Sequence, residues 1–128
     1  GLQRGALAST VAHDSHNLIV IGESDDDMML AARELERIGG GIAIAVDGEI
    51  AGSLALPIAG LMSKEGAETV AQEVGSLIAK AHALGVCEYY APFLTLAFLS
   101  LPVIPELKLT DRGLVDVNAF QFVSLQAK

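Results

Sequence analysis

The segment "GIAIAVDGEIAGSLAL", residues 41–56, places the strongest constraint on how this chain can fold. Two apolar runs flank Asp47 and Gly48. Asp-Gly is a strong signal for a two-residue hairpin turn, because both residues tolerate the positive φ angles that such a turn requires. The segment therefore predicts two antiparallel strands joined by a tight turn.

Three further segments have the composition of strands. "GALASTVA" (residues 5–12) and "LIVIGES" (residues 18–24) are short apolar runs bounded by polar residues, which predicts two strands joined by the polar sequence between them. "FQFVSL", residues 120–125, alternates as a half-buried strand does and predicts a final strand.

Two segments have apolar residues at helical spacing. The first is expected to begin at Ser24, an N-cap with Asp27 in the capping-box position, and to end at the glycines of residues 39–41. Its polar side chains are expected on the opposite, solvent-facing side: Arg33, Glu34, Glu36 and Arg37. The second is expected to be capped by Ser63 and to stop at Gly85, with His82 in its last turn.

The order strand–strand–helix–strand–strand–helix–loop–strand predicts an α+β fold. We expect a mostly antiparallel sheet with two main helices packed on one side of it, and one domain over residues 1–128. The chain is 52% hydrophobic with a mean hydropathy of +0.48, and it starts at Gly1. These properties suggest a piece of a larger protein with apolar surface meant for a neighbour.

Charge and composition exclude several classes of partner. The net charge is −8 and no Lys/Arg cluster is present, which argues against nucleic acid and anionic membranes. The longest apolar stretch, residues 91–105, is shorter than the ~20 residues that a membrane-spanning helix needs. A single cysteine, Cys87, excludes an internal disulfide and fits a reducing, cytoplasmic setting.

Five polar residues between the first two strands are the main candidate site: His13, Asp14, Ser15, His16 and Asn17. Two interpretations stay open. One is a turn in which Asp14 and Asn17 bind local backbone. The other is chemistry, either a metal site with Asp14 as third ligand or a Ser-His-Asp cluster, although adjacent residues rarely achieve the geometry of such a triad.

A second candidate follows the long apolar stretch. Arg112 lies between Asp111 and Asp116, so it is expected either to pair with a carboxylate and lock the turn or to reach a partner domain. No complete catalytic apparatus is visible in the sequence, so we assign no catalytic residue and no metal ligand to this chain.

Four ordered segments resemble the C-terminal domain of adenine deaminases of the amidohydrolase superfamily: "VAHDSHNLIVIG", "LPIAGLMS", "PFLTLAFLSLPVIPELKLTDRGLVDV" and "FQFVSL". The resemblance covers nearly the whole chain from about Gly5. It implies an enzyme of purine salvage that hydrolyses adenine to hypoxanthine and ammonia. It also implies a binuclear manganese or iron centre, held by ligands in a (β/α)₈ barrel that precedes this domain.

Under the same resemblance, residues 13–17 are expected to face the barrel or its active-site mouth, and Asp111 and Arg112 become candidate interdomain contacts. The expected partners are the barrel, adenine and a second copy in a homo-oligomer. Two alternatives remain: a non-catalytic module that stabilises the barrel or forms a dimer, and a free-standing protein that binds a small ligand.

Overall fold

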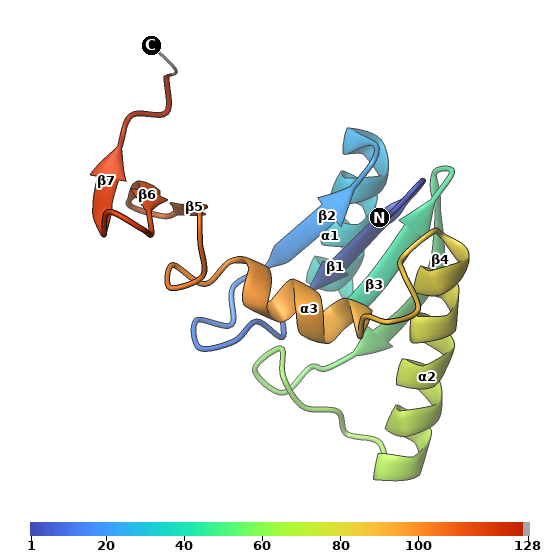
Figure 1. The fold of residues 1–128 in the computed structure, drawn as a ribbon. Helices are drawn as coiled ribbons and strands as arrows, with labels where there is room; N and C mark the ends of the chain where they lie inside the picture. Colours follow the sequence, from blue (N-terminus) through green and yellow to red (C-terminus); the bar gives the residue numbers. More distant parts are fainter. Residues whose placement is uncertain (127–128) are drawn as a thin grey trace. The chain divides into compact units, whose positions relative to one another are not determined.

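A four-stranded antiparallel sheet carries the first part of the chain. The computed structural model describes residues 1–126 and divides into two compact units, unit 1 (Gly1–Ala97) and unit 2 (from Phe98 onward). In unit 1, the strands β1 (Ala6–Ser9), β2 (Ile19–Gly22), β3 (Gly41–Val46) and β4 (Glu49–Ala55) lie in the order β2-β1-β3-β4 (Figure 1). The α+β fold class is therefore confirmed.

The predicted hairpin is present between β3 and β4. Val46 pairs with Glu49, and the two intervening residues, Asp47 and Gly48, have φ angles of 54° and 78°. Positive φ at both positions is the geometry that Asp-Gly favours in a two-residue turn. The backbone N–H of Gly48 also donates to Asp27 Oδ1 at 2.9 Å, which ties the turn to the first helix.

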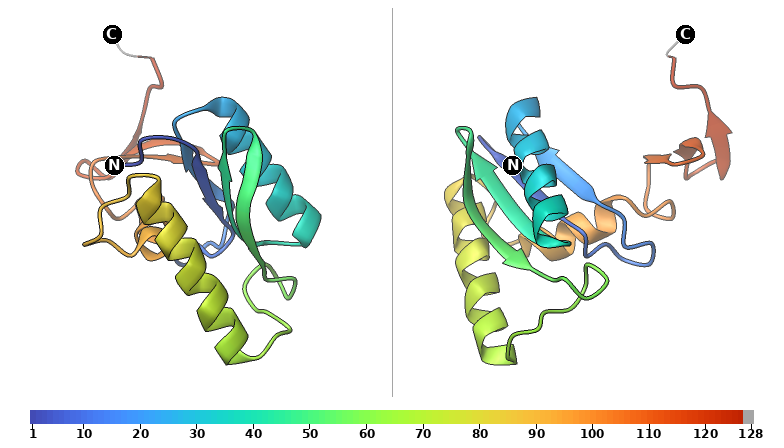
Figure 2. Two further views of the ribbon diagram at one scale, coloured as in Figure 1. Left: turned by 90° about the vertical axis from the view of Figure 1, so that its right-hand side faces the viewer. Right: turned by 180° about the vertical axis from the view of Figure 1, so that it is seen from behind.

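The two main helices cover opposite faces of this sheet, as the left view of Figure 2 shows. Helix α1 (Asp25–Ile38) packs through Ala31 and Leu35 on a layer of small side chains: Ala6, Ala8, Ala43 and Ala45. Helix α2 (Ala67–Ala83) packs through Leu77 and Ala81 on the other face, on Leu7, Ile42, Ile44 and Leu54. Our expectation of helices on one side was wrong. The central strands are apolar on both faces, and such strands are covered on both.

Local capping sets the ends of α1 as predicted. The Oγ of Ser24 accepts a hydrogen bond from the backbone N–H of Asp27 at 3.1 Å, and Gly39 ends the helix with φ 79°. The predicted cap of α2 was wrong, since Gly66 is the N-cap and Ser63 Oγ accepts from the N–H of Glu65 in a local turn. Gly85 follows the end of α2 with φ 105°, and His82 Nδ1 lies 3.0 Å from the carbonyl oxygen of Val86.

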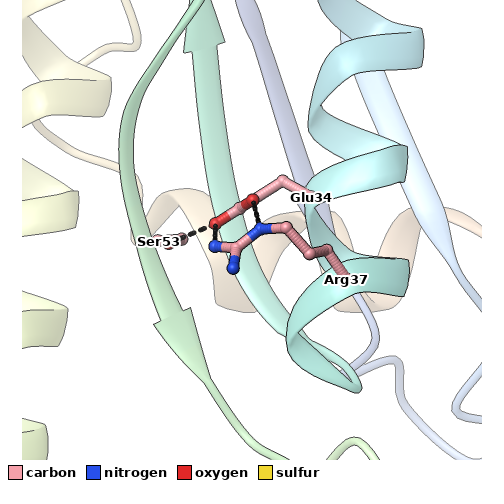
Figure 3. Close-up of polar contacts among 3 residues, drawn as sticks. All are labelled: Glu34, Arg37 and Ser53. Atoms are coloured by element: carbon pink, nitrogen blue, oxygen red, sulfur yellow. Dashed lines mark hydrogen bonds and ion pairs between the residues drawn. The ribbon is translucent and has the colours of Figure 1, made fainter.

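Glu34 is buried, contrary to its predicted place on the solvent face. Its two carboxylate oxygens accept from Arg37 Nε and Nη2, both at 2.7 Å, and Ser53 Oγ on β4 donates at 2.8 Å (Figure 3). The hydrogen bonds from Arg37 lower the pKa of Glu34, against desolvation that raises it, and the Ser53 hydroxyl lowers it further. These bonds account for a carboxylate against the sheet, because a buried charge must be paired.

A third helix, α3 (Pro92–Leu99), lies where a loop was predicted. Phe93 and Leu96 join the core of unit 1 with Leu7 and Leu84. The helix has apolar residues all round, so it lacks the one-sided pattern by which a surface helix is recognised in a sequence.

Unit 2 contains a separate antiparallel sheet with the strand order β5-β6-β7: β5 (Leu107–Thr110), β6 (Gly113–Asp116) and β7 (Gln121–Val123). The predicted final strand is confirmed over the residues of β7. The other two strands of this sheet, β5 and β6, were not predicted.

Candidate functional site

The five candidate residues lie in a nine-residue connection, residues 10–18, between β1 and β2 (Figure 1). All five are exposed. Asp14 and His16 have positive φ angles of 72° and 47°. A non-glycine residue in this region costs free energy and is held there by its surroundings. The predicted turn is therefore present, although the connection is longer than a tight hairpin.

Backbone contacts anchor this loop at its start. Ala12 is buried, and the N–H of His13 donates to the carbonyl oxygen of Ala97 at 3.0 Å. The N–H of Ser15 then donates to the carbonyl oxygen of His13 at 2.9 Å, and Ser15 Oγ donates to Asn17 Oδ1. The expected backbone contact of Asn17 is thus replaced by a side-chain contact within the loop.

The hydroxyl of Thr10 joins this loop to two others. It donates to the carbonyl oxygen of Gly60 at 2.7 Å and accepts from the N–H of Gly41 at 2.8 Å. A Cβ on Gly40 would lie 2.6 Å from the Cα of Gly60, so the two backbones approach more closely than any other residue allows. Three connections, β1–β2, α1–β3 and β4–α2, are therefore held together at one end of the sheet.

The connection that follows β4 contains a compact turn. Ile58 and Met62 exchange backbone hydrogen bonds of 3.1 and 3.2 Å, and the intervening Ala59 and Gly60 have φ angles of 58° and 72°. This geometry presents the carbonyl oxygen of Gly60 to Thr10.

A cavity of about 400 Å³ lies among these connections. His16 and Leu18 line it from the first loop, Glu36 and Gly40 from the end of α1, and Ala59 from the third loop. Of the five candidate residues, His16 alone is among its lining residues. Glu36 carries a negative charge, and the C-terminal end of α1 carries a partial negative charge. The cavity therefore suits a group that donates hydrogen bonds or carries positive charge.

Neither nucleophilic nor metal chemistry is assembled in the loop. Within residues 1–126, the part that the structure describes, no group of three or more His, Cys, Asp or Glu side chains is placed to hold a metal ion. The hydroxyl of Ser15 is directed at an amide and not at an imidazole, so it does not form a Ser-His pair. A role in contacting a substrate or the barrel stays a prediction.

Asp111 and Arg112 lie in the β5–β6 turn. Thr110 Oγ1 closes this turn by donating to the carbonyl oxygen of Gly113 at 2.8 Å and accepting from the N–H of Arg112 at 3.2 Å. The expected carboxylate pair was wrong: among the described residues, the ion pairs are Arg4–Asp47 and Arg37–Glu34. Asp111 and Arg112 instead line a cavity of about 380 Å³ with Phe120 and Phe122. The predicted interdomain contact remains a prediction.

Sequence reasoning missed Thr10 and Glu36. Thr10 follows Ser9 in an otherwise apolar run, and its partner Gly60 is fifty residues away, so no local pattern marks it. Glu36 was expected on the solvent face of α1, where it does lie, but the cavity beside it depends on loops from elsewhere.

In the described part of the chain, none of the helices is long and apolar enough to cross a membrane.

Comparison with known proteins identifies the family. A family model described as "Adenine deaminase C-terminal domain" matches residues 1–121.

Three curated relatives agree with this match. The chain is 61% identical over 123 residues to adenine deaminase 2 of Carboxydothermus hydrogenoformans, covering 96% of this chain and 22% of the relative. It is 56% identical over 124 residues to adenine deaminase of Clostridium acetobutylicum, covering 96% of this chain and 22% of the relative. It is 55% identical over 123 residues to an adenine deaminase of Dehalococcoides mccartyi, and this match covers 96% of this chain and 21% of the relative. The chain thus spans about a fifth of the length of these relatives, and it belongs to the adenine deaminase C-terminal domain family.

Proposed function

We propose that this chain is the C-terminal part of an adenine deaminase, a hydrolase that converts adenine and water to hypoxanthine and ammonia in purine metabolism. The observation that carries the proposal is the match of 96% of the chain to proteins named adenine deaminase, at 55–61% identity for the three relatives described above. Identity at this level over the whole domain supports a shared parent architecture. We also propose a cytoplasmic location, in line with the single cysteine.

The catalytic metal, manganese or iron, belongs in this proposal to a barrel in the preceding part of the enzyme. When bound there, it would supply an activated water at neutral pH. The described residues of this chain do not fit such a centre, because they offer no cluster of three metal-ligating side chains. The chain's own contribution is then to support the barrel and shape its surroundings.

The loop of residues 13–17 is the part of this domain that we propose faces the active-site mouth. Three features support this role. The loop is exposed, its start is anchored to Ala97, and His16 stands with Glu36 at a cavity that favours hydrogen-bond donors. A preorganised loop of this kind positions a polar group with little loss of entropy on binding.

An activity assay separates this proposal from the alternatives. Ammonia release from adenine is measured for the purified chain, for a parent enzyme lacking this domain, for a mixture of the two, and for the intact parent. We expect activity from the intact enzyme, restoration of activity in the mixture, and none from the chain alone with manganese added.

Each other result has a clear meaning. Full activity of the enzyme without this domain favours the alternative, a non-catalytic structural or dimerisation module. Purine binding by the isolated chain favours a free-standing ligand-binding protein. An intact parent that releases no ammonia from adenine refutes the proposed function.

A further inference from the structure

The small sheet of unit 2 has apolar residues on both of its faces. The strand register places Leu109, Leu114 and Val123 side by side in one cross-strand row, with Leu107 on the same face. The opposite face carries the row Lys108, Val115 and Phe122. An antiparallel sheet in contact with water on one side normally has polar residues on that side. Neither face of this sheet is wholly polar, although the first face also carries Asp116 and Gln121 and the second also carries Lys108 and Thr110.

Some of these apolar side chains are exposed, whereas Leu114, Val115 and Val123 are half-buried. The exposed fractions are 54% for Leu107 and 69% for Leu109 on the first face, and 59% for Phe122 on the second. Phe120, beside β7, is 82% exposed. Three strands of three or four residues bury little apolar surface by themselves, so packing on another element would add to the stability of this sheet.

The second face also has a cavity suited to a protein side chain. Val115, Phe120 and Phe122 line the space of about 380 Å³, and Arg112 lies among its lining residues. In the described chain the guanidinium of Arg112 takes part in no ion pair. Aromatic residues beside an arginine are the composition of the strongest contacts at protein interfaces. Asp111 also lines this cavity, so the arrangement fits an apolar side chain with a polar group next to it.

We propose, resting on the proposed function, that both faces of the β5-β6-β7 sheet dock on the preceding part of the same enzyme. In the first relative the matched segment is 22% of the length, and the family model describes a C-terminal domain, so a far longer stretch of chain precedes this domain in such relatives. A second copy of this chain is less able to cover both faces of the sheet. A two-fold interface places one patch against its own equivalent, and one such contact covers one face of the sheet.

Hydrogen–deuterium exchange tests this docking, comparing the intact parent enzyme with the 128-residue chain. Backbone amides of β5, β6 and β7 should exchange at least tenfold more slowly in the intact enzyme, because docking prevents local opening. In the intact enzyme, Leu107→Ser on one face and Phe122→Ser on the other should each remove most of this protection. Met29→Ser is the matched control, since Met29 on α1 is also 54% exposed, and it should leave the protection unchanged.

Two results would overturn the docking proposal. One is equal exchange of the three strands in the chain and in the intact enzyme. The other is protection in the 128-residue chain that increases with its concentration, which identifies a second copy as the occupant. Adenine deamination is measured on the same samples. Protected strands in an enzyme without deaminase activity refute the proposed function alone, whereas full activity with unprotected strands refutes the docking alone.

Discussion

Replacing Thr10 with valine tests whether one hydroxyl holds the three connections around the cavity. Valine keeps the shape of threonine but removes the donor to Gly60 and the acceptor for Gly41, at 2.7 and 2.8 Å. Each of these two partly buried hydrogen bonds contributes about 1 kcal/mol to stability. The expected loss is therefore about 2 kcal/mol, close to a 30-fold change in the unfolding equilibrium.

Urea denaturation of the chain measures this loss, and hydrogen exchange of the Gly41 amide reports the local opening. Thr10→Ser is the control, because serine retains the hydroxyl and should recover most of the stability. The reasoning is refuted if Thr10→Val changes the free energy of unfolding by less than about 0.5 kcal/mol, the range of an ordinary surface substitution, and leaves the Gly41 amide protected.

Three further predictions concern the charge, backbone and loop of unit 1. Arg37 holds the pKa of Glu34 below its ordinary value. The stabilising effect of the Glu34 carboxylate is therefore present above pH ~4.5 and is lost as the pH falls through the lower pKa of the folded state. Glu34→Gln should destabilise the chain at pH 7 by about 1 kcal/mol, and thermal unfolding should show this difference shrinking in acid. Gly40→Ala should destabilise far more than Gly48→Ala, because a Cβ would meet the Gly60 backbone at the first position and open space at the second, a comparison that urea denaturation makes directly. In the intact parent enzyme, His16→Gln should lower turnover at least tenfold, about 1.4 kcal/mol, with metal content unchanged, whereas unchanged turnover would make the loop purely structural.

Features set by neighbouring residues could be predicted from the sequence. The hairpin at Asp47-Gly48 and the ends of α1 at Ser24 and Gly39 were correct, because turn and cap geometry depends on residues a few positions apart. Helix α3, which is apolar except for Thr95, could not be recognised as a helix, since no polar side marks its period.

The candidate site was predictable only in part. The loop of residues 13–17 was identified by its unusual polarity. The choice of His16 among its residues depends on a backbone bend and on a cavity that segments distant in the sequence also line. Contacts between residues that are distant in the sequence are set by tertiary packing, and the periodicity of apolar residues does not reveal them.

The alanine layer beneath α1 has a consequence for the dimensions of the cavity. Ala6, Ala8, Ala43 and Ala45 are fully buried and allow α1 to lie close to the sheet. Replacing one of these alanines with valine would push the helix outward, because packed interiors have no spare volume. Glu36 and Gly40, at the end of that helix, would move with it. The distance between α1 and the sheet thus sets the width of the cavity, and a substitution such as Ala43→Val would change that width without replacing a lining residue.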